Sequence, residues 1–82
     1  MALSQHTTKF KSYRQWDTSD VSDWLINKLK LPQYSEKFKE IGVDGQIIEY
    51  ITDTDLEKDF GIILRLHRVK IIEGIKSLQT ET

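Results

Sequence analysis

The side chains that could do chemistry gather in two stretches of the second half of the chain. The first stretch, residues 44–60, is acidic and sets six carboxylates against a single lysine, Lys58. The second stretch, residues 61–78, is basic and sets four cationic side chains against Glu73. Closely spaced carboxylates suggest a calcium loop, and His67 within the basic stretch suggests acid–base chemistry.

Neither chemistry finds the partners that it needs. In the run from Asp53 to Asp59, Lys58 stands at the sixth position, where an EF-hand loop requires glycine for its sharp turn. His67 has no serine or cysteine that the sequence nominates as a nucleophile, and no P-loop, G-x-S-x-G or H-E-x-x-H motif occurs. The chain also lacks cysteine. We therefore predict no enzymatic activity, no metal site and no cofactor.

The size and composition of the chain limit the remaining classes. Its 82 residues suffice for one small domain, with 38% apolar and 30% charged residues and a net charge of −1. That charge argues against a strongly basic nucleic-acid-binding surface. The sequence contains no run of eighteen apolar residues and no secretory signal, so we expect a cytoplasmic protein.

The spacing of apolar residues favours helices throughout. Asp17 and Thr52 are typical N-caps, each with an aspartate three residues later, and Gly42 suits a helix C-terminus. Segments such as 47–51 could be strands by composition, but the flanking caps argue against this. The expected helices cover residues 18–29, 32–41, 47–51, 53–60 and 64–78, within a domain that spans residues 16–80.

The same spacing predicts which side chains are buried. We expect the second helix to bury Tyr34, Phe38 and Ile41, and the short segment 47–51 to be buried as a whole. Gly74 lies in the middle of the last helix, where close contact with another helix is a reason for its presence. The last helix should bury the residues spaced by threes, with Ile71 beside them: Leu66, Val69, Ile72, Ile75 and Leu78.

The first fifteen residues are expected to differ from the rest of the chain. They are polar and lack periodicity, so residues 1–15 are predicted to be a flexible arm. Phe10 and Tyr13 are the two side chains of the arm that could dock on the domain. The arm carries three cationic residues, which are too few for firm membrane attachment without a second signal.

The order of the motifs resembles a sterile alpha motif (SAM) domain over about residues 16–78. The resemblance implies a compact five-helix bundle with a long C-terminal helix, in agreement with the helices above. The residues that carry the resemblance, in chain order, are Trp16, Asp20-Val21, Trp24-Leu25, Leu31-Pro-Gln-Tyr34, Phe38, Ile41-Gly-Val-Asp-Gly45, Ile47-Ile48, Thr52-Asp-Thr-Asp55-Leu56, Phe60-Gly61-Ile62, His67-Arg68 and Ile71-Ile72.

The resemblance also implies two interaction surfaces that join SAM domains head to tail. The mid-loop surface is commonly acidic, and here it would comprise Asp44, Glu49, Asp53, Asp55, Glu57 and Asp59. The end-helix surface is commonly basic, and here it would comprise Leu64, Arg65, Leu66, His67, Arg68 and Lys70. The family often has glycine where this chain has Leu66, so Leu66 either anchors the contact or blocks it.

The expected function is therefore protein–protein association with another SAM domain, either homotypic or heterotypic, within a larger signalling or scaffold protein. Such contacts could produce a closed oligomer or an open polymer. Alternatively, the acidic and basic stretches are simply charged faces exposed to solvent, and they do not form two complementary patches. A second function class is RNA hairpin binding, which some SAM domains perform with the basic start of the last helix. It would use Arg65, Arg68, Lys70 and Lys76 here.

Overall fold

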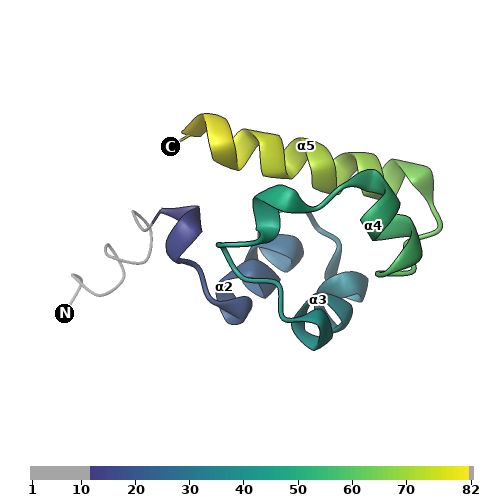
Figure 1. Cartoon of the computed structure of the whole chain (residues 1–82), viewed down its shortest axis with the longest axis horizontal. Coiled ribbons are helices and arrows are strands. Elements are labelled where there is room, and N and C mark those ends of the chain that lie inside the picture. Colours follow the sequence, from purple (N-terminus) through teal and green to yellow (C-terminus); the bar gives the residue numbers. More distant parts are fainter. Residues whose placement is uncertain (1–11, 82) are drawn as a thin grey trace.

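The computed structural model describes residues 12–81 as an all-helical fold with a long C-terminal helix, as expected. The α-helices are α2 (Thr18–Asp23), α3 (Ser35–Ile41), α4 (Asp53–Lys58) and α5 (Arg65–Glu81). A π-helical segment, Trp24–Lys28, continues α2, and 3₁₀ turns cover Tyr13–Gln15, Pro32–Tyr34 and Ile48–Tyr50. In Figure 1, α5 runs along one side of the molecule, with α4 near its beginning and with α2 and α3 on the other side.

Both predicted capping boxes are present. The Asp17 carboxylate accepts a hydrogen bond from the Asp20 backbone N–H at 2.9 Å, and the Asp20 carboxylate accepts the Asp17 N–H at 3.0 Å. Thr52 and Asp55 repeat the arrangement at the start of α4, at 3.1 and 3.0 Å. These bonds satisfy backbone donors that a helix start otherwise leaves free, and they fix where α2 and α4 begin.

The predicted helix 32–41 begins and ends as expected, but one of its side chains is not buried as expected. Pro32 opens the 3₁₀ turn that leads into α3, and Gly42 ends α3 in the left-handed conformation at φ 85°. Phe38 is buried against Phe60, with ring centroids 4.6 Å apart. The prediction that Ile41 is buried is wrong, because Ile41 lies at the exposed end of the helix.

The segment after α3 also differs from expectation. Ile48 is completely buried, whereas Ile47 is exposed and Tyr50 is 71% exposed. A short 3₁₀ turn has only about three residues per revolution, so one of its side chains can face the core while its neighbours face outward. The prediction of a wholly buried segment is therefore wrong for Ile47 and Tyr50.

The inner face of α5 is turned relative to the predicted one. Its buried side chains are Arg68, Ile71, Ile75 and Leu78, whereas Val69 and Ile72 are half-buried. Leu66 is 69% exposed, which agrees with the expectation that it could meet a partner and not with its place in the core stripe. Residues spaced strictly by threes drift around a helix with 3.6 residues per turn, and the stripe cannot stay on one face over four steps.

Gly74 brings α5 close to α2 and its π-helical continuation, as predicted. We call this continuous stretch, residues 18–29, the first helical unit. A Cβ atom at this position would lie 2.8 Å from Leu29 Cδ2 and 3.0 Å from Trp24 Cζ2. Both contacts are too short for a carbon pair, so a side chain here would force these two neighbours to move. Among the helices within residues 12–81, none is both long and apolar enough to span a membrane.

The end of the predicted arm belongs to the folded body. Tyr13 is only 2% exposed and forms part of the core, which corrects the expectation for residues 12–15. Gly45 permits this packing because a Cβ atom there would collide with the backbone of Tyr13. Its backbone N–H donates to the Trp16 carbonyl at 2.9 Å. Phe10 and the rest of residues 1–11 lie outside the described part of the chain.

Candidate interaction surfaces

The acidic residues predicted for the mid-loop surface have different surroundings. Asp44 and Asp55 cap local backbone N–H groups, with Asp44 accepting from Gln46 at 3.0 Å. Glu49 and Asp53 accept hydrogen bonds from residues elsewhere in the fold. Within the described residues, the side chains of Glu57 and Asp59 alone among those of the six predicted acids have no hydrogen bond or ion pair. Two of the six acids, Glu49 and Asp53, are therefore paired with a cation inside the molecule. No group of three potential metal ligands occurs within residues 12–81.

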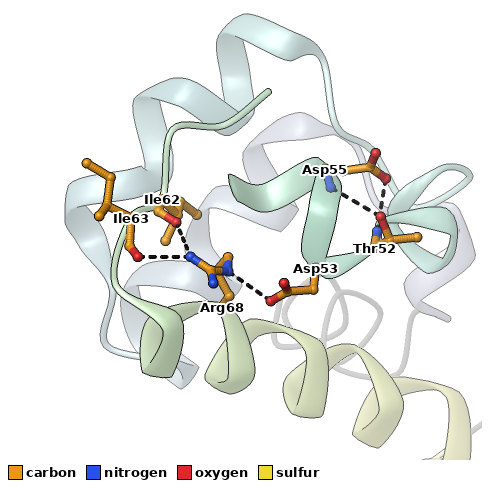
Figure 2. Close-up of polar contacts among 6 residues, drawn as sticks. All are labelled: Thr52, Asp53, Asp55, Ile62, Ile63 and Arg68. Atoms are coloured by element: carbon orange, nitrogen blue, oxygen red, sulfur yellow. Dashed lines mark hydrogen bonds and ion pairs between the residues drawn. The ribbon is translucent and has the colours of Figure 1, made fainter. Parts of the chain in front are cut away.

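Arg68 is the main correction to the predicted end-helix surface. It is 8% exposed, and its Nε donates to Asp53 Oδ1 at 2.8 Å. Its Nη1 donates to the carbonyls of Ile62 and Ile63 at 2.8 and 2.9 Å (Figure 2). The guanidinium thus joins the start of α4, the loop before α5 and α5 itself. A buried arginine with three charge-assisted hydrogen bonds of this kind holds these segments together, and little of its side chain is exposed to a partner.

His67 is engaged inside the molecule too. Its Nδ1 is hydrogen-bonded to the Tyr34 hydroxyl at 2.5 Å, and the two rings meet edge to face with centroids 5.4 Å apart. The imidazole is half-buried. This contact ties α5 to the turn before α3. His67 therefore has a structural contact, and its role at the end-helix surface stays a prediction.

An exposed apolar cluster remains at the start of α5. Ile63 is 84% exposed, Leu64 and Leu66 are also exposed, and Arg65 stands among them. We call Ile63, Leu64, Arg65 and Leu66 the end-helix surface from here on. The loop backbone is held by Arg68, which lets these side chains point outward. Lys70 lies about one turn further along α5 than Leu66 and lines a separate groove.

A second apolar surface lies beside the short turn after α3. It is a shallow hollow of about 260 Å³ that we call the mid-loop groove. Its lining residues are Ile41, Val43, Ile47, Tyr50, Ile51, Asp55, Asp59 and Phe60. Sequence reasoning missed it because it placed Ile41, Ile47 and Tyr50 in the core. Four large apolar residues within 47–51 could have signalled it, since a single short turn cannot bury them all.

The N-terminal turn braces the mid-loop region through a hydrogen bond. The buried Tyr13 hydroxyl donates to Glu49 Oε1 at 2.6 Å, and Arg14 lies 3.4 Å from the same oxygen. The hydrogen bond from Tyr13 lowers the pKa of Glu49 from its ordinary value of 4.5, and Arg14 acts in the same direction. The same bond, with burial, raises the pKa of Tyr13 from 10.0.

The lowered pKa predicts a pH dependence of folding. Because the carboxylate of Glu49 is favoured in the folded state, its contribution is present above pH 4.5 and is lost as the pH falls through the lowered pKa. Glu49→Gln should therefore show a smaller loss of stability between neutral and acidic pH than the wild type does. Urea unfolding at a series of pH values measures this. Glu57→Gln, a control at an exposed acid, should leave the wild-type profile intact.

Comparison with known proteins agrees with this architecture. The family model for the sterile alpha motif matches residues 13–79, so the chain belongs to the SAM family, whose members are generally protein–protein interaction modules. It is 34% identical over 64 residues to the NAD(+) hydrolase tir-1 of Caenorhabditis elegans, covering 78% of this chain and 6% of that protein.

Two further relatives show the same partial coverage. The NAD(+) hydrolase SARM1 of Danio rerio is 32% identical over 69 residues, which cover 84% of this chain and 10% of that protein. Kazrin of Homo sapiens is 38% identical over 55 residues, which cover 67% of this chain and 7% of that protein. The chain thus matches only a small part of each of these relatives.

Proposed function

We propose that this domain binds another SAM domain head to tail, with the end-helix surface of one domain seated in the mid-loop groove of the next. The partner is a second copy of this chain or the SAM domain of a related protein. The observation that carries the proposal is the presence of two exposed apolar surfaces that share no residue. A contact between two different surfaces leaves one of each free, so the assembly can grow.

The chemistry of the two surfaces is complementary. The end-helix surface offers three apolar side chains that protrude, and the mid-loop groove offers an apolar hollow to receive one or more of them. Arg65 stands beside the first, while Asp55 and Asp59 line the second. Apolar burial at the centre supplies affinity, and the opposite charges at the edge favour encounter and orientation. Leu66 is then an anchor of the contact.

Introduction of a negative charge at one exposed apolar position on each surface tests the proposal. Leu66→Asp and Ile47→Asp should each abolish the concentration-dependent growth in mass that we expect of the wild type in sedimentation velocity. Each substitution should weaken self-association at least tenfold, about 1.4 kcal/mol. An equal mixture of the two variants should form dimers but nothing larger, because each variant retains one intact surface.

The control is Ile26→Asp, which places the same charge at an exposed apolar residue outside both surfaces. It should assemble as the wild type does. A wild type that stays monomeric and captures no SAM domain, or a mixture of the two variants that forms no dimer, would contradict the proposal.

The RNA-binding alternative receives less support from the fold. Two of its four proposed phosphate contacts have partners inside the molecule, since Arg68 is buried on Asp53 and Lys76 lies 3.3 Å from Glu73. The hydrolase activity in the names of two relatives belongs to those proteins. Because the match covers a tenth of their length or less, we do not extend it to this chain.

A further inference from the structure

A further hollow on residues 12–81 lies on a third surface, between α5 and the first helical unit. Its volume is about 370 Å³, at the lower end of the range for small-molecule sites. It is lined by Trp16, Trp24, Lys28, Leu29, Lys70, Glu73, Gly74, Ser77 and Leu78. None of these residues belongs to the end-helix surface or the mid-loop groove. We call it the tryptophan groove.

The walls of the tryptophan groove are mainly apolar. Trp16 and Trp24 stand side by side with ring centroids 6.2 Å apart and planes tilted by 54°, and Trp16 is only half-buried. Leu29 and Leu78 contribute further apolar surface. Gly74 keeps the backbone of α5 close to Trp24 and Leu29, where any side chain would collide with both. Together these groups form a surface suited to a flat or flexible apolar body.

The charges at the groove favour an anion. Lys28 and Lys70 are exposed and have no hydrogen bond or ion pair within the described part of the chain. Glu73, the one acidic lining residue, already lies 3.3 Å from Lys76. Two ammonium groups without a partner among residues 12–81 therefore line the groove beside the two tryptophans, one from each helical unit. The backbone around Lys28 is itself unusual, since Trp24–Lys28 is π-helical, a geometry frequent at functional sites.

We propose that the tryptophan groove binds a small soluble amphiphile with an aromatic or acyl body and an anionic head group. The body lies against Trp16 and Trp24, and the head group lies between Lys28 and Lys70. A partner helix, about 10 Å across with its side chains, needs a longer groove with several anchor positions. A single compact body matches a hollow of this size.

The chain carries its own reporter for this site, because both of its tryptophans line the groove. The probe is 1-anilinonaphthalene-8-sulfonate, an aromatic body with one sulfonate, titrated into the full chain. Binding should be seen as energy transfer from the tryptophans to the probe. N-phenyl-1-naphthylamine, which has the same body without the sulfonate, should bind at least tenfold more weakly.

Variants assign the binding to the groove. Lys28→Glu with Lys70→Glu should weaken binding of the sulfonate probe at least tenfold and leave that of the neutral probe within about twofold. Ser77→Phe, which fills the groove from the exposed side of α5, should weaken both probes. The matched control is Lys37→Glu with Lys39→Glu on α3, which should leave both affinities unchanged. All four lysines and Ser77 are exposed, so melting curves should confirm that each variant is folded.

Three results would overturn the proposal. The first is equal affinity for the charged and neutral probes. The second is sulfonate binding that survives the Lys28 and Lys70 substitutions or falls equally in the Lys37 and Lys39 control. The third is an absence of probe binding while the chain binds vesicles of anionic phospholipid, which would make the two lysines a membrane contact.

Discussion

Gly45→Ala is expected to remove most of the stability of the domain. A Cβ atom at this position would lie 1.8 Å from the backbone oxygen of Tyr13 and 2.9 Å from the backbone of Arg14 and Trp16. These are backbone atoms, so no side-chain rotation relieves the clash. The turn that carries Tyr13 must move away, which also removes the Gly45 N–H bond to the Trp16 carbonyl. The expected loss is about 3 kcal/mol or more.

That loss is large in relation to the net folding stability of a domain of this size. A single small core rarely supplies more than about 3–5 kcal/mol of net stability. Withdrawal of Tyr13 also breaks its hydrogen bond to Glu49, so the mid-loop region loses its brace. Circular dichroism melting and urea titration of the full chain measure the effect. We expect the unfolding transition to shift to much lower urea or to disappear.

Gly61→Ala is the matched control. Gly61 has a positive φ of 68°, yet a Cβ there would meet nothing within 4 Å. Its cost is the left-handed backbone alone, about 1–2 kcal/mol. If Gly45→Ala proved no more destabilising than Gly61→Ala, the close approach of residues 13–16 to Gly45 would be wrong.

Local signals in the sequence were enough to locate the helices. The N-caps at Asp17 and Thr52 and the C-terminal Gly42 act through hydrogen bonds and backbone angles within a few residues, and the structure confirms all three. Tertiary packing decides which side chains are buried. Ile47 and Ile48 are adjacent and chemically identical, yet one is exposed and the other buried. Their difference depends on how the turn is set against α5, which local spacing does not encode.

The interaction surfaces were harder to predict than the fold for a physical reason. Charge reasoning counts ionic groups along the chain, but pairing within the molecule depends on distances in space. Arg68 and Asp53 are fifteen positions apart and meet at 2.8 Å, so the Arg68 side chain is buried against Asp53, which itself stays more than half exposed. Large apolar side chains also remain exposed next to these charges, among them Ile47, Ile63 and Leu66. The many large apolar residues in 47–51 and 62–66 are the sequence signal for the two surfaces that we propose.

Arg68→Met is expected to destabilise the domain by about 3 kcal/mol while keeping most of the side-chain volume. Methionine cannot donate, so the carbonyls of Ile62 and Ile63 lose the donor that satisfies them inside the protein. Asp53 loses its cation as well, although more than half of its side chain is exposed and solvent recovers part of that interaction. Arg68→Lys should recover only part of the loss, since one ammonium cannot reproduce the three contacts of the guanidinium fork.

Arg65→Met provides the matched control, because it makes the same chemical change at an exposed position three residues earlier. Its stability should stay within about 0.5 kcal/mol of the wild type. Urea unfolding of the two variants measures the difference directly, and equal midpoints would show that Arg68 does not hold the loop.

The position of Arg68 also links stability to association. Its bonds to two consecutive loop carbonyls fix the backbone that presents Ile63 and Leu64 (Figure 2). Arg68→Glu, which charge reasoning alone offers as a way to cap the end-helix surface, would therefore reduce association by loosening the fold. Leu66→Asp separates the two effects, because Leu66 is exposed and its change should weaken association with the melting curve nearly unmoved. Assembly that persists in Arg68→Met wherever the variant stays folded would show that Arg68 supports the fold and does not contact the partner.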